Sequence, residues 1–280
     1  MICIEGCDIT GHSLFSRRKE MNNDLLIAIQ QAAKQKVMMN QNHPLAYVMK
    51  AFFAGVYLTL AGVVSLYISQ NFAGEASALG KLLNALIFGV GLVIIIMMKA
   101  ELATSNMMFL TSGVLQKSIR TTQGLKVLGL CTLGNLIGCL FTAGLLSLST
   151  PYQAINHDAL LYTTVASKVF KPVAVMIVDA ILANILVNIA VIGQMQLKNE
   201  MARLTFIILT IFIFVYFGFE HVIANFGSFS LAYFLDSAQI VDVSLIDILW
   251  SWVIVFIGNA IGGSAIMGVF FTLTEKVIAR

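Results

Sequence analysis

The sequence has few charged residues. Asp, Glu, Lys and Arg make up 11% of its 280 residues, whereas hydrophobic residues make up 59%. A soluble domain carries roughly a quarter charged residues, so this chain has less than half the usual share. Its net charge of +3 is too small to indicate a nucleic-acid partner. The apolar residues form blocks of about twenty, the length that crosses a bilayer, and therefore predict an integral membrane protein.

Cysteines and clustered metal ligands are also scarce. Cys3 and Cys7 lie in a polar N-terminal stretch, and Cys131 and Cys139 lie in one hydrophobic segment, where they are read as small apolar fillers. A metal site needs ligands clustered at a set spacing, and the chain has no such cluster. We therefore expect no structural disulfide, no metal and no cofactor.

The N-terminal segment differs from the rest of the chain. It has no apolar core long enough for a signal peptide. The run 16–21 would suit the codons of a bacterial ribosome-binding site, so we expect a bacterial protein whose natural start is Met21. Residues 1–23 are predicted to be a disordered or wrongly assigned extension. Residues 24–42 have apolar side chains at helical spacing and predict an amphipathic helix on the cytoplasmic side.

Residues 43–280 are predicted to form an all-α membrane domain with six transmembrane helices. Lys and Arg are far more frequent in the connections on the N-terminal side, which places both termini in the cytoplasm. The predicted spans are 47–70, 82–98 with a shorter segment at 105–116, 125–149, 172–196, 204–217 with a continuation to 234, and 247–273.

The second and fifth predicted spans are both interrupted by polar residues. Three spans in each half give the halves, about 47–149 and 172–274, opposite orientations. Matching breaks in two halves point to a site at an inverted-repeat interface. Broken backbone at membrane depth is tolerated only where it is buried in protein or lines a cavity. The pattern therefore predicts a pore between the two breaks.

Several residues that can carry charge lie at predicted membrane depth, where facing lipid would cost several kcal/mol. His221 is the most informative, because an imidazole near neutral pH can donate to an anion or offer a proton. The alternative is a buried histidine held by carbonyl groups at the break. The adjacent Glu220 points about 100° away on a helix, so we expect it to hold the broken backbone, as Glu101 does at the first break. Lys99 and Asp179 are predicted to pair.

Neutral polar residues near the breaks allow two interpretations. Thr104, Asn184 and Asn259 are either interhelical contacts or polar partners of His221 and a solute. Gly134–Gly138 and Gly258–Gly263 each begin Gly-Asn, which is a second sign of an internal repeat. Just outside the fourth span, Lys168 and Lys171 are either interfacial lysines or a cationic mouth that concentrates anions.

These motifs, taken in order, resemble those of the formate/nitrite transporter family over about residues 24–274. The resemblance implies an aquaporin-like inverted repeat with interrupted second and fifth helices, assembled as a homopentamer in the cytoplasmic membrane. Members pass formate, nitrite, hydrosulfide or related small anions, with protons as possible co-substrates. The matching motifs are Gly218–Asn225, Glu101–Thr104 with Met108–Thr111, Ile181–Asn184 and Gly258–Gly263.

The resemblance also implies roles for single residues. The central histidine is His221, the vestibule lysine is Lys168, and the polar neighbours are Thr104, Asn184 and Asn259. Constrictions fall at Phe88, Leu92 and Phe214, whereas Ala103 stands where the family usually has an aromatic and is expected to widen one slit. Asp179 also departs from the family, which has a basic or neutral residue there. The residues assigned a structural role are Glu101, Glu220, Asn225, Lys99 and Asp179.

Other functions remain open at this stage. The same fold could pass hydrosulfide or larger monocarboxylates such as acetate and lactate. A neutral-solute aquaporin-like channel would need paired asparagine-containing repeat boxes, which the sequence lacks. An intramembrane zinc enzyme would need a second histidine four residues after His221, where the chain has Asn225. We therefore expect a transporter rather than an enzyme.

Overall fold

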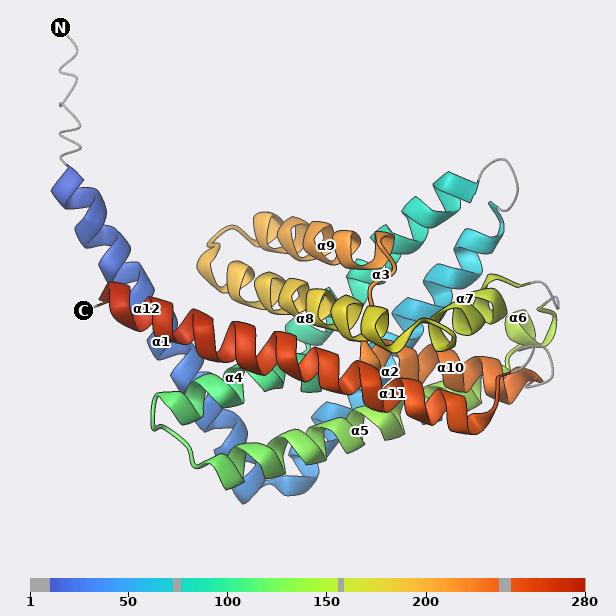
Figure 1. Cartoon of the computed structure of the whole chain (residues 1–280), viewed down its shortest axis with the longest axis horizontal. Coiled ribbons are helices and arrows are strands. Elements are labelled where there is room, and N and C mark those ends of the chain that lie inside the picture. The colour runs from blue at the N-terminus through green and yellow to red at the C-terminus, as the bar shows by residue number, and fades with distance from the viewer. Residues whose placement is uncertain (1–10, 73–76, 156–158, 237–242, 280) are drawn as a thin grey trace, which may run out of the picture.

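The computed structural model describes residues 11–72, 77–155, 159–236 and 243–279. Within these ranges every regular element is a helix (Figure 1), as the sequence predicts. The elements in chain order are α1 (Gly11–Asn42), α2 (Pro44–Gln70), α3 (Ser77–Met97), α4 (Ala103–Leu115), α5 (Thr121–Ser147), α6 (Thr150–Gln153), α7 (Leu160–Val169), α8 (Val173–Gln196), α9 (Glu200–Tyr216), α10 (Val222–Asp236), α11 (Leu245–Ala260), the π-helix η3 (Ile261–Phe270) and α12 (Phe271–Ala279).

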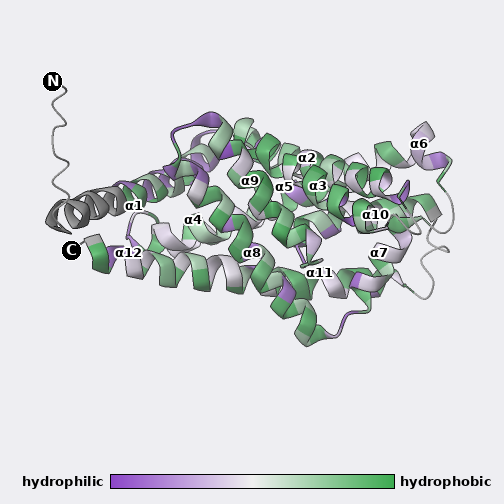
Figure 2. Ribbon diagram, turned by 90° about the horizontal axis from the view of Figure 1, so that it is seen from above, coloured by the Kyte–Doolittle hydropathy of each residue, from purple (hydrophilic) through white to green (hydrophobic). Residues whose placement is uncertain are grey.

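Among the described residues, 5 helices are long and apolar enough to cross a membrane. They are α2, α3, α5, α8 and the continuous helix Leu245–Ile278 formed by α11, η3 and α12. The segment predicted as the fifth span consists of the shorter helices α9 and α10, with 17 and 15 residues. Hydrophobic residues cover most of the long helices (Figure 2). The membrane-protein class is confirmed, and the count of six spans stays a prediction.

The α1 helix begins at Gly11, well before the predicted start at residue 24. No proline or glycine lies between His12 and Asn42, so nothing in the backbone chemistry stops the helix from extending into the polar stretch. Its C-terminal half packs on α4 and α12 through a buried apolar face. That face consists of Leu25, Leu26, Ile29, Ala33 and Val37. The predicted start at Met21 is untested, and residues 1–10 lie outside the described residues.

Two non-helical segments separate α3 from α4 and α9 from α10. Residues 98–102 lie between α3 and α4, and residues 217–221 lie between α9 and α10. Each contains a residue in the left-handed region, Lys99 with φ 51° and Gly218 with φ 69°. Glycine adopts this conformation freely, whereas a lysine does so at a cost. We call these segments the first break and the second break.

The short helix that follows each break packs into the opposite half of the chain. α4 contacts η3 and α8, whereas α10 contacts α5 and α2. The halves are therefore interlocked, and this exchange brings the first residues of α4 and α10 together. The connection between the halves carries α6 and α7, and α7 packs on α2 and α10.

Small residues let the long helices approach closely at equivalent places in the two halves. A Cβ at Gly134 of α5 would lie 2.7 Å from Ala51 Cβ of α2, and a Cβ at Gly258 of α11 would lie 2.6 Å from Ala180 Cβ of α8. Real Cβ atoms do not come this close. The Gly-Asn motifs therefore mark where α5 packs on α2 and where α11 packs on α8.

Candidate functional site

The second break is held by Asn259 of α11. Its Nδ2 donates to Ala180 O at 2.7 Å and to Glu220 O at 2.9 Å, and its Oδ1 accepts from Val222 N at 2.9 Å. The asparagine is completely buried. One side chain therefore satisfies two backbone groups that the missing helical turn leaves unpaired, Glu220 O and Val222 N, and ties them to α8 through Ala180 O.

The first break is held in the same way by Asn135 of α5. Its Nδ2 donates to Ala51 O at 2.7 Å and to Glu101 O at 2.8 Å, and its Oδ1 accepts from Ala103 N at 2.9 Å. Three contacts of one asparagine thus recur at the two breaks. The shared Gly-Asn motif was the sequence signal for this pair, although Asn135 had no role assigned to it.

The two breaks meet at His221. Its Nε2 lies 2.8 Å from Thr104 Oγ1 in the first turn of α4, and its Nδ1 accepts from Ala224 N at 3.3 Å. Because Nδ1 accepts a backbone hydrogen bond, the neutral ring carries its proton on Nε2. The Nε2–H group then donates the hydrogen bond to Thr104 Oγ1. The ring centroid lies 5.8 Å from that of Phe214, and His221 is 2% exposed.

Asn184 of α8 binds backbone carbonyl groups close to His221. Its Nδ2 donates to Asn259 O at 2.6 Å and to Thr104 O at 3.2 Å. Of the three neutral residues proposed from sequence to surround the histidine, Thr104 contacts its ring. Asn184 and Asn259 instead hold the backbone beside it.

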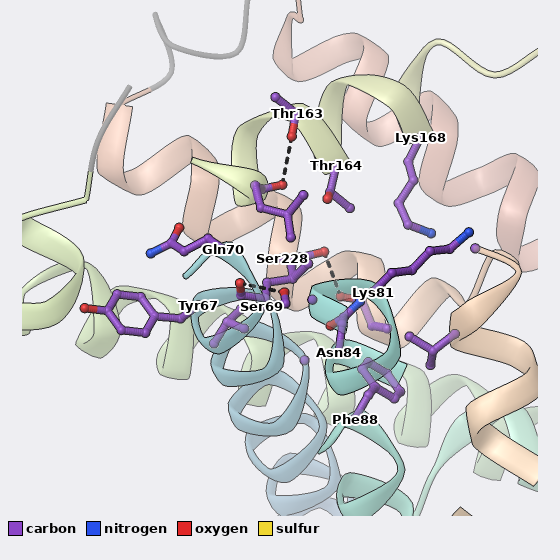
Figure 3. A pocket seen from close by; sticks show the side chains of 18 of the residues that line it. Tyr67, Ser69, Gln70, Lys81, Asn84, Phe88, Thr163, Thr164, Lys168 and Ser228 are labelled. Carbon is purple, nitrogen blue, oxygen red and sulfur yellow. Dashed lines mark hydrogen bonds between the residues drawn. The ribbon is translucent and has the colours of Figure 1, made fainter. Parts of the chain in front are cut away.

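A cavity of about 750 Å³ leads towards His221. We call it the main cavity, and Figure 3 shows part of its lining. Its most deeply buried aromatic and imidazole side chains are Phe88, Phe214 and His221. The rest of the lining mixes apolar and polar side chains and comes mainly from α2, α3, α7 and the segment 214–228. The polar residues include Ser69, Gln70, Asn84, Thr163, Thr164 and Ser228.

Apolar side chains close the inner end of the main cavity. The rings of Phe88 and Phe214 meet edge to face with centroids 5.6 Å apart. Leu92 follows Phe88 one turn later on α3 and is 3% exposed. Ala103 is completely buried. Neither Leu92 nor Ala103 is among the residues that line the main cavity.

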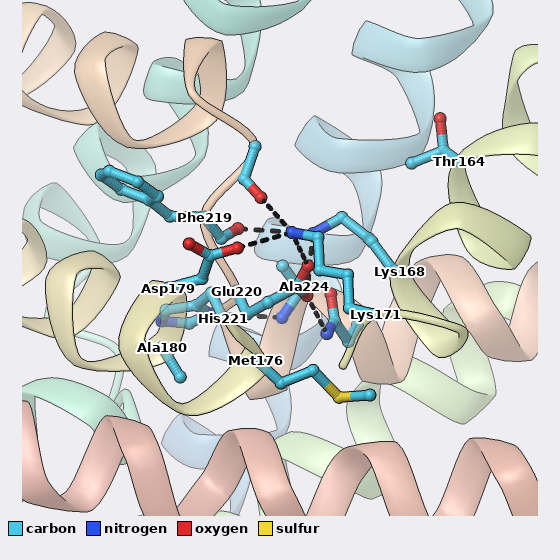
Figure 4. A network of polar contacts seen from close by, with 12 residues as sticks. Thr164, Lys168, Lys171, Met176, Asp179, Ala180, Phe219, Glu220, His221 and Ala224 are labelled. Atoms are coloured by element: carbon cyan, nitrogen blue, oxygen red, sulfur yellow. Dashed lines mark hydrogen bonds and ion pairs between the residues drawn. The ribbon is translucent and has the colours of Figure 1, made fainter. Parts of the chain in front are cut away.

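Glu220 of the second break is the centre of an ion-pair cluster (Figure 4). Lys168 Nζ lies 2.9 Å from Glu220 Oε2, and Lys171 Nζ lies 2.6 Å from Glu220 Oε1. Asn225 Nδ2 donates to the same carboxylate at 2.8 Å. The lysines also donate to backbone carbonyls of the break, Phe219 O at 3.3 Å and Gly218 O at 2.8 Å. The fully buried carboxylate is thus compensated from two sides.

Asp179 completes this cluster, and its partner differs from the predicted one. Lys171 Nζ lies 2.7 Å from Asp179 Oδ2, whereas Lys99 is exposed at the first break. The predicted pair of Lys99 and Asp179 is therefore wrong. Burial alone would lower the pKa of Lys171, but the carboxylates of Glu220 and Asp179 outweigh it and raise that pKa above its ordinary value.

Glu101 of the first break has a different source of compensation. Lys36 of α1 lies 2.7 Å from Glu101 Oε2, and Asn106 Nδ2 donates to the same oxygen at 2.9 Å. Sequence reasoning did not single out Lys36. The sequence does place Lys36 on the apolar face of α1, because it lies three residues after Ala33 and seven after Ile29. A lysine on that face indicates a buried partner.

The comparisons with known proteins agree with this geometry. A model of the formate/nitrite transporter family matches residues 23–273. The chain is 29% identical over 233 residues to the nitrite transporter NirC of Escherichia coli (strain K12), covering 82% of this chain and 84% of NirC. It is 29% identical over 244 residues to the formate channel FocA of Haemophilus influenzae, covering 81% of this chain and 86% of FocA.

Solved structures show the same fold. A chain described as an FNT family ion channel superposes with a TM-score of 0.84 at 25% identity, covering 90% of this chain and 99% of that one. A pentameric formate channel with formate bound superposes with a TM-score of 0.69 at 22% identity, covering 82% and 97%. Because the family model spans residues 23–273 and the predicted motifs converge on the two breaks, the chain belongs to the formate/nitrite transporter family.

Proposed function

We propose that this protein transports small monovalent weak-acid anions, formate or nitrite first among them, across the cytoplasmic membrane. The observation that carries the proposal is the contact of 2.8 Å between His221 Nε2 and Thr104 Oγ1. It joins the two breaks at the inner end of the main cavity. The relatives described as a nitrite transporter and a formate channel support the same substrate class.

The proposed mechanism lets the solute cross with little net charge. A bare anion in a dry apolar constriction is strongly penalised, whereas a neutral weak acid is not. Phe88 and Phe214, with Leu92 beyond them, form the apolar gate. His221 donates a hydrogen bond from Nε2 when the solute replaces Thr104 as its partner. Full proton transfer starts from the imidazolium ring, which takes its second proton from water in the cavity and returns to the neutral ring once the anion is protonated. The anion thus becomes neutral, or nearly so, where the path is driest.

We further propose that the halves form an inverted repeat of six spans, with α3–α4 and α9–α10 as its interrupted members. The recurrence of the asparagine contacts at both breaks supports this architecture. The fold it shares with the pentameric formate channel supports assembly as a homopentamer. Both termini are proposed to be cytoplasmic, so that the main cavity opens outwards.

Uptake into proteoliposomes tests the transport proposal. Purified protein is reconstituted, and initial rates for formate and nitrite are measured at pH 5.5 and pH 7.5, with His221→Phe and His43→Asn beside the wild type. His43 precedes α2 and is exposed, so it is a matched histidine away from the site. We expect wild-type uptake to rise at low pH and His221→Phe to abolish weak-acid uptake or leave bare anion conductance. Unchanged pH-dependent uptake in His221→Phe would refute the role of the histidine.

The substrate range depends on Ala103 in this proposal. A small side chain at a position where the family usually has an aromatic gives more room, so acetate and lactate are candidates beside hydrosulfide. We expect Ala103→Phe to reduce acetate and lactate uptake more than formate uptake. Glycerol and water permeation, measured in the same vesicles, distinguishes the alternative of a neutral-solute channel: that alternative holds if these permeate and no anion does.

A further inference from the structure

Lys81 is a cation at the main cavity that neither the family resemblance nor the proposed mechanism uses. It lies in the second turn of α3, is exposed, and lines the cavity. Its Nζ lies 4.7 Å from the centroid of the Tyr216 ring, a distance at which the ring face holds an ammonium group without cancelling its charge. Figure 3 shows Lys81 and Lys168 extending on the same side of the pocket in that view.

The other two lysines near the main cavity are already compensated. Lys168 and Lys171 contribute two positive charges, and Glu220 and Asp179 contribute two negative charges, all within one contiguous set of ion pairs. A neutral cluster has little field at a distance, because opposite charges a few ångströms apart cancel beyond their own separation. Lys168 thus lines the cavity without giving it a net positive potential.

Lys81 has no such partner in the part of the chain that the structure describes. The ion pairs there involve Lys36, Lys168 and Lys171. We propose that Lys81 supplies the net positive charge that draws anions into the main cavity, and that Asp179 sets the strength of this attraction by cancelling the charge of Lys171. This inference rests on the proposed function, because it identifies the recruiting cation of the same pathway.

The attraction has a specific kinetic signature. A unit charge acting over about 10 Å, through an effective dielectric of about 25 to 80, changes the local anion concentration roughly two- to tenfold. Such an effect changes uptake at low anion concentration and leaves the saturating rate unchanged. Salt suppresses it, since the Debye length is about 30 Å at 0.01 M and about 3 Å at 1 M.

Four variants test this inference by formate and nitrite uptake in proteoliposomes of known orientation, at about 0.01 M and about 1 M salt. Lys81→Gln removes the charge, Lys81→Arg keeps it, and Asp179→Asn releases the charge of Lys171 while leaving its contact with Glu220. Lys126→Gln is the control, because Lys126 is an exposed lysine in the second turn of α5 that does not line the main cavity.

We expect Lys81→Gln to slow subsaturating uptake about two- to tenfold at low salt, with no difference at high salt or at saturation. Lys81→Arg and Lys126→Gln should match the wild type, and Asp179→Asn should be faster at low salt. The inference is overturned if Lys81→Gln matches Lys126→Gln at low salt, or if it is equally slow at both salt concentrations. A wild type that takes up neither anion instead overturns the proposed function, and the inference with it.

Discussion

Replacing Asn259 with leucine tests whether one side chain holds the second break. Leucine has the same number of side-chain heavy atoms as asparagine and the same branching at Cγ, but it is bulkier and forms no hydrogen bonds. The change leaves Glu220 O and Val222 N without the partners that lie within 2.9 Å in the structure. It also removes an additional hydrogen bond from Ala180 O, which stays paired inside α8. These groups are buried in the protein interior, so water cannot replace the lost contacts.

The magnitude follows from the two orphaned groups. Leaving one buried polar group unsatisfied costs about 1 to 3 kcal/mol, so we expect a total of roughly 2 to 6 kcal/mol. With roughly 2 to 4 °C lost per kcal/mol in a chain of this size, the melting temperature in detergent should fall on the order of 10 °C. Asn135→Leu should lower it by a similar amount, because Asn135 makes the equivalent contacts at the first break.

The matched control is Asn188→Leu. Asn188 is also completely buried, but its Nδ2 binds only Asn184, and its Oδ1 has no partner. Removing an acceptor that is already unsatisfied offsets the lost hydrogen bonds, so we expect a change of at most about 1 kcal/mol. The reasoning fails if Asn259→Leu melts no lower than Asn188→Leu. Melting is followed by differential scanning fluorimetry at one scan rate for all variants, since membrane proteins often unfold irreversibly.

Two further changes probe the packing and the first break. Gly262→Ala should lower the melting temperature, at a cost of about 1 to 3 kcal/mol, because the new Cβ would collide with a backbone carbonyl of α8. A Cβ at Gly129 would have no atom within 4 Å, so Gly129→Ala should be neutral or slightly stabilising. Equal melting temperatures of the two variants would contradict the close approach of the helices at Gly262. Lys36→Gln should speed amide hydrogen exchange in α1 by removing the pair with Glu101. Lys34→Gln, an exposed neighbour on the same helix, should leave that exchange unchanged, and equal exchange in both variants would show that the pair does not anchor α1.

Hydrophobicity along the chain was sufficient to predict the class and the places of the breaks. Long apolar runs and the polar residues that interrupt them are local features, and they mark α2, α3, α5, α8 and α11 as well as residues near 101 and 220. His221 could also be singled out from sequence, because a histidine at membrane depth must have a partner or face water. The α1 start was predicted too late, since a polar helix carries no hydropathy signal.

Only the tertiary structure decided which polar groups meet. Asp179 was predicted to pair with Lys99 from depth alone, but it pairs with Lys171 at 2.7 Å. Lys36 reaches Glu101 across 65 positions of sequence, and Asn259 binds backbone atoms of the second break rather than the ring of His221. The physical reason is that hydropathy is a property of each segment by itself. The partner of a buried charge or amide depends on which helices pack together and on how far each side chain can reach.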